Sequence, residues 1–353
     1  MLFQLPKSGI DSLLEDNETL KYLSSQRVGM ITHQNALTQT YQVSAHVLQE
    51  KIGPALKCIF SPEHGWSGQV AEGEKVANGF DFHLNIPIFS LYGASSPEEL
   101  EVDVLIIDLQ DVGLRCYTYG ATCAQLLDKH STLEVIVCDR PNPLGSRQKG
   151  PPLDPTFRSL VGYFDVPFQH GKTLGELLLN HNQNRAIRVV SCPHDHQPYH
   201  YPWIPPSPNL PTWEATLLYP ALVLLEGTNI SEGRGTSFPF TCLGAPGLDQ
   251  ESLLQFLKPQ KGIQARPLTF TPQSGKGKGE VCTGAHLLLT DYDHLEAFEL
   301  GVELVAFLKS TYTPFEWVKD EKQNYFIDLL LGSDGFRKDL ERPPLPFDGI
   351  HLT

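Results

Sequence analysis

Several features are missing from this 353-residue sequence, and each absence excludes a class of protein. No stretch of about eighteen apolar residues occurs, so the sequence predicts no helix that spans a membrane. The N-terminus, MLFQLPKSGIDSLLEDNETL, lacks the basic start and the unbroken apolar segment of a secretory signal. We therefore expect a cytoplasmic protein with no membrane partner.

Long runs of positive charge are also missing. The formal net charge is -14, the sequence pI is about 5.3, and the basic cluster around Lys276 and Lys278 is short and rich in glycine. Nucleic acids bind proteins largely through clustered Lys and Arg, so the sequence predicts no nucleic-acid partner. A few converging arginines can still bind an anionic small molecule against this acidic background.

Cofactor and metal motifs are scarce. The seven cysteines are scattered and form no CxxC pair, which is typical of reduced, buried thiols in the cytosol. No GxGxxG follows the first predicted strand, and GKGKGE at 275–280 lacks the ending of a phosphate-binding loop. We expect no bound cofactor.

Short runs rich in Val, Ile and Leu alternate with helical patterns along the first half of the chain. This alternation predicts a mostly parallel sheet covered by helices on both faces. The predicted helices cover 41–51, 118–130 and 173–183. The predicted strands are RVGMIT at 27–32, ALKCIF at 55–60, VDVLIIDL at 102–109, EVIVCD at 134–139 and IRVVSC at 187–192.

The pattern changes after the proline-rich and aromatic stretch PYHYPWIPPSPNLPTW at 198–213. A helix is predicted through EATLLYPALVLLEG, and helices over 251–257 and 293–309 flank strands near 264–271 and 281–290. The fold class predicted is α/β, with a Rossmann-like, mostly parallel sheet domain at 1–238 and a smaller α+β domain at 239–353.

All five predicted strands end in polar residues. Ligands of open α/β sheets bind beyond the carboxyl ends of the strands, so these side chains are expected to share one crevice. They are His33, Gln34 and Asn35; Glu63 and His64; Gln110, Asp111 and Arg115; Asp139, Arg140 and Asn142; and His194, Asp195 and His196.

Glu63 lies in FSPEHGWSG at 60–68, in a turn fixed by proline and glycine. A glutamate here is either a turn residue without a catalytic role or a general acid. The neighbouring Trp66 could form an apolar wall that raises the pKa of the carboxyl group and so favours its protonated form. A second carboxylate could come from Glu72 or Glu74, which are otherwise solvated loop charges. Asp111 is a further candidate, with turn formation or a pair with Arg115 as its structural alternative.

Two groups have strong structural explanations. Thr173 and Glu176 in HGKTLGEL have the spacing of a capping box at a helix N-terminus. Cys192, His194, Asp195, His196 and His200 are zinc-ligand types, but their spacing in a loop before prolines is more typical of polar surface than of a metal site.

Arg140 in DRPNPLG and Arg234 in EGRGTSFPF are placed in turns. A guanidinium held in this way forks onto a carboxylate or phosphate. The structural alternative is an ion pair with Asp139 for Arg140 and with Glu232 for Arg234. The sequence leaves both interpretations open.

Eight ordered motifs together resemble the NamZ-type exo-β-N-acetylmuramidases, a family once catalogued as a domain of unknown function. The resemblance spans residues 9–250 and weakens after that. The motifs are FSPEHGWSG, LYG at 91–93, DLQDVGLRCYTYG at 108–120, DRPNPLG at 139–145, GPPL at 150–153, HGKTLGEL at 170–177, PPSPNLP at 205–211 and LLEGTNISEGRGTSFPF at 224–240.

The resemblance implies release of N-acetylmuramic acid from the non-reducing end of peptidoglycan fragments, with a sugar as the small-molecule partner. It also implies an active site in the cleft between the two domains, which the smaller domain at 239–353 closes. It assigns the catalytic glutamate to Glu63. Glu74 and Asp111, which the resemblance does not assign, stay the candidates for a second catalytic carboxylate. The resemblance leaves inverting, retaining and substrate-assisted routes open. The predicted substrate-binding residues are His33, Asn35, His64, Gln110, Arg115, Tyr117, Tyr119, Asp139, Arg140, Asn142, Asn209, Asn229 and Arg234.

The sequence departs from the family pattern after the first predicted strand, and the histidine-rich loop at 194–200 is not part of that pattern. THQNA at 32–36 puts His33 where the family has asparagine and loses a glycine, which bears on substrate preference. Two other functions remain possible at this stage: a metal-dependent amidase or esterase built on the histidine-rich loop, and a non-catalytic sugar-binding module.

Overall fold

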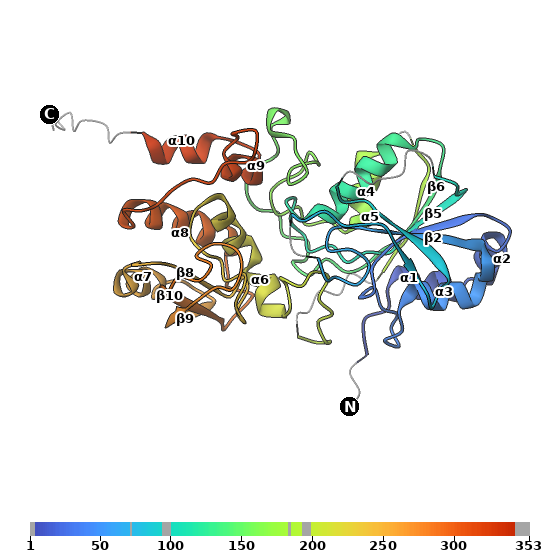
Figure 1. Cartoon of the computed structure of the whole chain (residues 1–353), viewed down its shortest axis with the longest axis horizontal. Helices are drawn as coiled ribbons and strands as arrows, with labels where there is room; N and C mark the ends of the chain where they lie inside the picture. Colours follow the sequence, from blue (N-terminus) through green and yellow to red (C-terminus); the bar gives the residue numbers. More distant parts are fainter. Residues whose placement is uncertain (1–3, 71–72, 94–99, 183–184, 193–198, 343–353) are drawn as a thin grey trace.

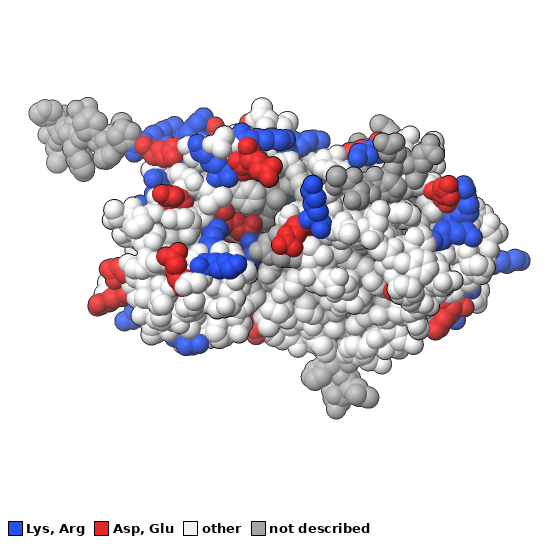
Figure 2. Space-filling model, viewed as in Figure 1, with Lys and Arg blue, Asp and Glu red and all other residues white. Residues whose placement is uncertain are grey.

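The computed structural model describes residues 4–70, 73–93, 100–182, 185–192 and 199–342. It has two parts that lie side by side, a half built on a large sheet and a half built on helices and a small sheet (Figure 1). On the face shown in Figure 2, charged side chains of both signs gather over the second half. The adjoining surface of the sheet half is largely uncharged.

The large sheet has seven strands in the order β3-β4-β2-β1-β5-β6-β7, and every neighbouring pair is parallel except β3 with β4. Leaving out the edge strand β3, the order is third, second, first, fourth, fifth and sixth along the chain, which is that of the Rossmann fold. The strands are β1 (Val28–Ile31), β2 (Leu56–Ser61), β3 (Gly79–Asp81), β4 (Ile86–Ser90), β5 (Val104–Ile107), β6 (Glu134–Cys138) and β7 (Ile187–Val190).

This sheet confirms the predicted fold class and all five predicted strands. Strands β3 and β4 were not predicted. β4 is interrupted by Pro87 and only alternate residues are buried, while β3 is three residues long and largely exposed. Short edge strands of this kind leave a weak sequence pattern.

Helices cover both faces of the sheet because neighbouring strand residues point in opposite directions. In β5, Val104 and Ile106 pack into the core formed with one set of helices, whereas Leu105 and Ile107 pack into the core on the other face. The helices of the first face are α1 (Gly9–Glu15), α2 (Asn17–Leu23) and α3 (Ser44–Ile52), and those of the second are α4 (Thr118–Lys129) and α5 (Leu174–His181).

Helix α5 begins with the predicted capping box. The side chain of Thr173 accepts a hydrogen bond from the Glu176 backbone, and Glu176 accepts one from the Thr173 backbone. Glu176 is thereby committed to the helix N-terminus.

The second half confirms the smaller α+β unit. Its antiparallel sheet has the order β8-β10-β9, and α6 packs against α8. Its elements are α6 (Trp213–Leu222), the 3₁₀-helix η3 (Val223–Gly227), β8 (Cys242–Ala245), α7 (Gln250–Leu257), β9 (Ile263–Phe270), β10 (Cys282–Leu289), α8 (Ala297–Thr311), α9 (Phe326–Leu331) and α10 (Gly335–Glu341). The predicted domain boundary at 238/239 stays a prediction. Two more 3₁₀-helices, η1 (Gly53–Ala55) and η2 (Pro155–Phe157), lie in the first half.

Candidate active site

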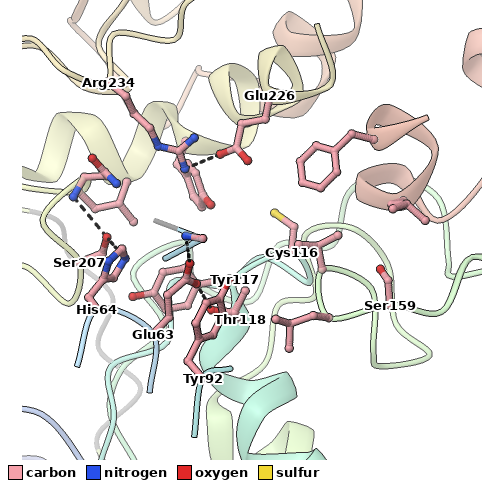
Figure 3. A pocket seen from close by; sticks show the side chains of 18 of the residues that line it. Glu63, His64, Tyr92, Cys116, Tyr117, Thr118, Ser159, Ser207, Glu226 and Arg234 are labelled. Carbon is pink, nitrogen blue, oxygen red and sulfur yellow. Dashed lines mark hydrogen bonds and ion pairs between the residues drawn. The ribbon is translucent and has the colours of Figure 1, made fainter. Parts of the chain in front are cut away.

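A cavity of about 440 Å³ lies where the carboxyl ends of β2, β4 and β5 meet the second half (Figure 3). Both halves contribute side chains to it. Five of the predicted site residues line this cavity: Glu63, His64, Tyr117, Asn209 and Arg234. Its other lining residues are Gly73, Tyr92, Cys116, Thr118, Ser159, Leu160, Val161, Ser207, Leu210, Tyr219, Glu226, Phe240, Asp320, Phe326 and Leu329.

A tight turn directly after β2 carries Glu63. The Gly65 backbone N–H donates to the carbonyl of Pro62 at 3.1 Å, and His64 has a φ of 70°. A left-handed conformation at a residue other than glycine costs about 1–3 kcal/mol and persists where the surroundings hold it. The strain at His64 therefore marks a turn that is held in place by its neighbours.

Two hydrogen bonds hold the His64 ring. Its Nδ1 lies 2.8 Å from the Val70 carbonyl and its Nε2 lies 3.1 Å from Ser207 Oγ. Because a carbonyl only accepts, Nδ1 carries the proton, and in the neutral ring Nε2 accepts from the Ser207 hydroxyl. Ser207 in turn accepts from the Asn209 backbone N–H. The motif PPSPNLP thus supports the turn that presents Glu63.

The Glu63 carboxylate is oriented through both of its oxygens. Oε2 accepts from the Thr118 hydroxyl at 2.6 Å, and Oε1 accepts from the Gly73 backbone N–H at 3.0 Å. Thr118 is the first residue of α4, so the carboxylate also lies near the positive end of that helix. Burial, and then the neighbouring Glu63 carboxylate, raise the pKa of Tyr92. Figure 3 shows Glu63 beside Tyr92 and Thr118 on one wall.

Trp66 does not form the expected apolar wall. It is absent from the cavity lining, and its ring lies against His46, with centroids 6.4 Å apart, at the edge of the core on the α1–α3 face. Tyr92 and Tyr117 are the aromatic residues of the cavity on the Glu63 side.

The opposite wall carries a cluster of ion pairs. Arg234 Nη2 lies 2.7 Å from Glu226, and its Nη1 lies 3.3 Å from Glu232, which also pairs with Lys276 at 3.1 Å. The Arg234 guanidinium covers the ring of Phe240 at 4.8 Å from its centroid. The ion pair with Glu232 foreseen in the sequence is present, and Glu226 is an additional partner.

The two carboxylates of this cluster differ in pKa. Burial raises the pKa of Glu226, and Arg234 offsets only part of that rise. Burial alone would raise the pKa of Glu232 too, but Lys276 and Arg234 outweigh it and hold that pKa below its ordinary value. The two pKa shifts have opposite directions, so Glu226 takes up a proton more readily than Glu232.

The predicted acids Asp111 and Glu74 lie outside the cavity. Asp111 accepts from the Gly113 backbone at 2.7 Å and lies 3.3 Å from the His170 ring, so it forms the turn after β5. Glu74 is exposed. Glu72, the other loop acid, lies outside the described residues.

Arg115 is buried behind the cavity rather than in it. Its guanidinium donates to the carbonyls of Val166 at 2.6 Å, Pro151 at 3.1 Å and Leu330 at 3.3 Å. Burial lowers the pKa of Arg115 to about 10, which leaves it charged at neutral pH. Arg115 joins the sheet half to α9 instead of pairing with Asp111.

The polar residues after β6 are bound to other parts of the protein. Arg140 pairs with Asp108 at 2.6 Å rather than with Asp139. Asp139 instead accepts hydrogen bonds from the Thr173 hydroxyl and the Gly175 backbone N–H, and burial raises its pKa. Asn142 and Gln110 donate to backbone carbonyls, those of Lys172 and Pro141. None of these side chains lines the cavity.

His33, Asn35 and Tyr119 surround a smaller cavity of about 110 Å³ behind the Glu63 turn. Burial, followed by Arg140, lowers the pKa of His33 to about 3, so its ring is neutral. Asn35 donates to the Pro205 carbonyl, and the Tyr119 hydroxyl donates to that of Pro206 at 2.6 Å. Asn229 lies elsewhere, between Pro314 and Glu316.

Several lining residues were missed from the sequence. Tyr92 and Thr118 lie inside the LYG and DLQDVGLRCYTYG motifs, yet nothing in their own spacing separates them from neighbouring polar residues. Glu226 follows the apolar run ALVLL and reads as the end of a buried helix. Its ion-pair partner, Arg234, follows eight residues later in a separate turn, and the folded structure is needed to show that the two side chains meet.

A metal site finds no support among the described residues, which contain no group of three or more His, Cys, Asp or Glu side chains able to hold an ion. His194, Asp195 and His196 lie outside those residues, so the histidine-rich loop is not decided by this result. In the part of the chain that the structure describes, no helix is long and apolar enough to cross a membrane. All seven cysteines are buried and unpaired, as expected.

Two family descriptions match the chain in succession. "Exo-beta-N-acetylmuramidase NamZ, N-terminal" matches residues 28–214, and "Exo-beta-N-acetylmuramidase NamZ, C-terminal" matches residues 217–346. The chain belongs to the NamZ family. Membership confirms the resemblance and identifies the chain as a glycoside hydrolase.

Individual relatives agree with this family. The chain is 37% identical to the peptidoglycan β-N-acetylmuramidase NamZ of Bacillus subtilis, over 95% of this chain and 84% of the relative. Two crystal structures of DUF1343 family proteins from Bacteroides fragilis are each 28% identical to it. One has a TM-score of 0.79 over 94% of this chain and 90% of its own, and the other has 0.70 over 95% and 90%.

Proposed function

We propose that this NamZ-family chain releases N-acetylmuramic acid from the non-reducing end of peptidoglycan fragments, with Glu63 as the general acid. The observation that carries the proposal is the Glu63 carboxylate, held between Thr118 and Gly73 in the cavity shared by the two halves. The name of the Bacillus subtilis relative supports the substrate class.

The chemistry needs an acid because a glycosidic oxygen leaves readily only when it is protonated. The Thr118 hydroxyl and the Gly73 N–H fix both carboxylate oxygens, so the proton is delivered from a defined direction. The same two donors stabilise the carboxylate that remains after proton transfer. Glu63 can then act as the base that activates water in the next step.

The second catalytic group is proposed to be the acetamido oxygen of the sugar itself. Two other described acids, Glu226 and Asp320, line the cavity. Glu226 is ion-paired with Arg234, and Asp320 accepts from the Lys322 and Asn324 backbones in its own loop. An internal nucleophile requires only one protein acid at the scissile bond, and this supports a substrate-assisted route.

The sugar is recognised by polar groups on both walls in this proposal. Arg234 binds the lactyl carboxylate, which N-acetylglucosamine lacks, because guanidinium groups form strong charge-assisted bonds with carboxylates. Asn209 lines the cavity near His64 and contacts the acetamido group. Arg140, Arg115 and Asn142 take no part, since each is bound to other protein groups.

The test is the release of N-acetylmuramic acid from the disaccharide MurNAc-GlcNAc in the presence of a chelator. Wild type is expected to release it, and Glu63→Gln to lose about 100- to 10,000-fold in kcat with unchanged thermal unfolding. Glu50→Gln, an exposed change in α3, serves as the matched control and keeps full activity.

The same assay separates the other possible functions. Activity that disappears with chelator alone would indicate a metal-dependent hydrolase. Binding of the disaccharide without release by wild type would indicate a sugar-binding module. A cytoplasmic location remains a prediction, which fractionation of cells that make the protein tests directly.

A further inference from the structure

Glu226 is the feature of the cavity that the proposed reaction leaves unused. It lies in η3 on the wall opposite Glu63, and its carboxylate is 2.7 Å from Arg234 Nη2 (Figure 3). Of the two carboxylates that pair with Arg234, Glu226 lines the cavity. Glu232 is more deeply buried and pairs with Lys276 as well.

The charges in this cluster balance as long as Glu226 is ionised. Arg234 and Lys276 carry two positive charges, and Glu226 and Glu232 carry two negative ones. A carboxylate added by a ligand would leave the cluster with an excess negative charge inside the protein, which is unfavourable. One added proton removes that excess.

We propose that Glu226 determines the selectivity for an anionic sugar by occupying Arg234 in the empty cavity and by taking up one proton when the sugar's carboxylate replaces it. This inference rests on the proposed function. The proton comes from solvent, and no bond of the sugar is made or broken in this step. Protonated Glu226 is then a hydrogen-bond donor to the carboxylate that displaced it.

Selectivity follows from the exchange. A neutral sugar leaves the pair intact and gains nothing from Arg234, whereas an anionic sugar gains the charge-assisted bonds. Small anions of the cell bind Arg234 weakly because its guanidinium is already paired with Glu226. Glu226 therefore prevents Arg234 from being a general anion site and reserves it for a ligand whose remaining groups also fit the cavity.

Several other groups face Glu226 and enter any pH dependence. They are Arg234, Glu232 and Lys276 of its own cluster, Cys116 after β5 and Tyr219 of α6. Burial raises the pKa of Cys116 to a value above the neutral range, and it raises that of Tyr219 as well, so both stay uncharged there. Of the two carboxylates in this set, burial raises the pKa of Glu226 whereas Lys276 and Arg234 hold that of Glu232 below its ordinary value, so Glu226 is the group expected to take up the proton.

The experiment is calorimetric titration of full-length Glu63→Gln with MurNAc-GlcNAc in buffers that differ in ionisation enthalpy. Above the pH at which Glu226 ionises, we expect uptake of about one proton per disaccharide and a tenfold weaker affinity for each further pH unit. Adding Glu226→Gln is expected to abolish the uptake and flatten the pH dependence. It should also make free acetate or phosphate a stronger competitor.

GlcNAc-GlcNAc is the matched ligand control, since it lacks the lactyl carboxylate and is expected to bind without proton uptake. Binding of MurNAc-GlcNAc with no uptake, or uptake that persists after Glu226→Gln, would overturn the inference and leave the proposed function intact. If Glu63→Gln binds no MurNAc-GlcNAc at any pH and wild type releases no sugar, both fail together.

Discussion

The end of β2 differs from the ends of β5 and β6, although all three are equally polar in the sequence. After β5 and β6, Asp111, Arg115, Asp139 and Arg140 are bound to other groups of the protein. After β2, the carboxylate of Glu63 is oriented by two donors and still lines a cavity. A polar strand end becomes a candidate site only when its partners leave a face open to ligand.

The largest effect on stability is expected at Arg140. Changing Arg140→Met leaves the buried Asp108 carboxylate without its guanidinium, and loss of one member of a buried pair costs about 3–5 kcal/mol. Urea unfolding measures this loss, while kcat per folded molecule stays at the wild-type value. A loss of kcat with unchanged stability would show that the β6 end belongs to the site after all.

A smaller effect, on catalysis instead of folding, is expected at Thr118. Thr118→Val removes the hydroxyl bond to Glu63, and a bond to a charged group contributes about 1.5–3 kcal/mol, or roughly 10- to 100-fold in kcat. Thr122→Val is the matched control, because Thr122 lies one turn further along α4 with a buried hydroxyl that has no partner among the described residues. Equal kinetics for the two variants would remove Thr118 from the mechanism.

The smallest effect is expected at Ser207, which reaches Glu63 only through His64. Ser207→Ala removes one neutral hydrogen bond to the strained turn, at a cost of about 1 kcal/mol, or roughly fivefold in kcat. Steady-state kinetics should show that loss in kcat rather than in KM. An effect on KM alone would mean that Ser207 contacts the sugar and does not position the turn.

The fold was largely predictable because its signals are local. Runs such as VDVLIIDL need no long-range knowledge to be recognised as buried strands, and the Thr173–Glu176 spacing defined a helix start. β3 and β4 escaped prediction because an edge strand with Pro87 and exposed alternate residues resembles a loop. The position of Glu63 was predictable from the same logic, as a residue fixed in a turn at a strand end.

The partners of the other polar residues were not predictable, because they come from distant parts of the chain. Asp108 and Arg140 are 32 positions apart, and Arg115 and Leu330 are 215 apart. Ordinary sequence spacing carries no information about such contacts. Glu226 illustrates the reverse error, since a residue that appears to end a buried helix proves to line the cavity.

The buried Arg115 side chain connects segments that are far apart in the sequence, next to the cavity. Its guanidinium is bonded to Pro151 and Val166 in one half and to Leu330 in α9, next to the lining residue Leu329. A buried cation held by three carbonyls is costly to detach. The bond to Leu330 therefore ties α9, and with it the lining residue Leu329, to the part of the chain that carries Arg115.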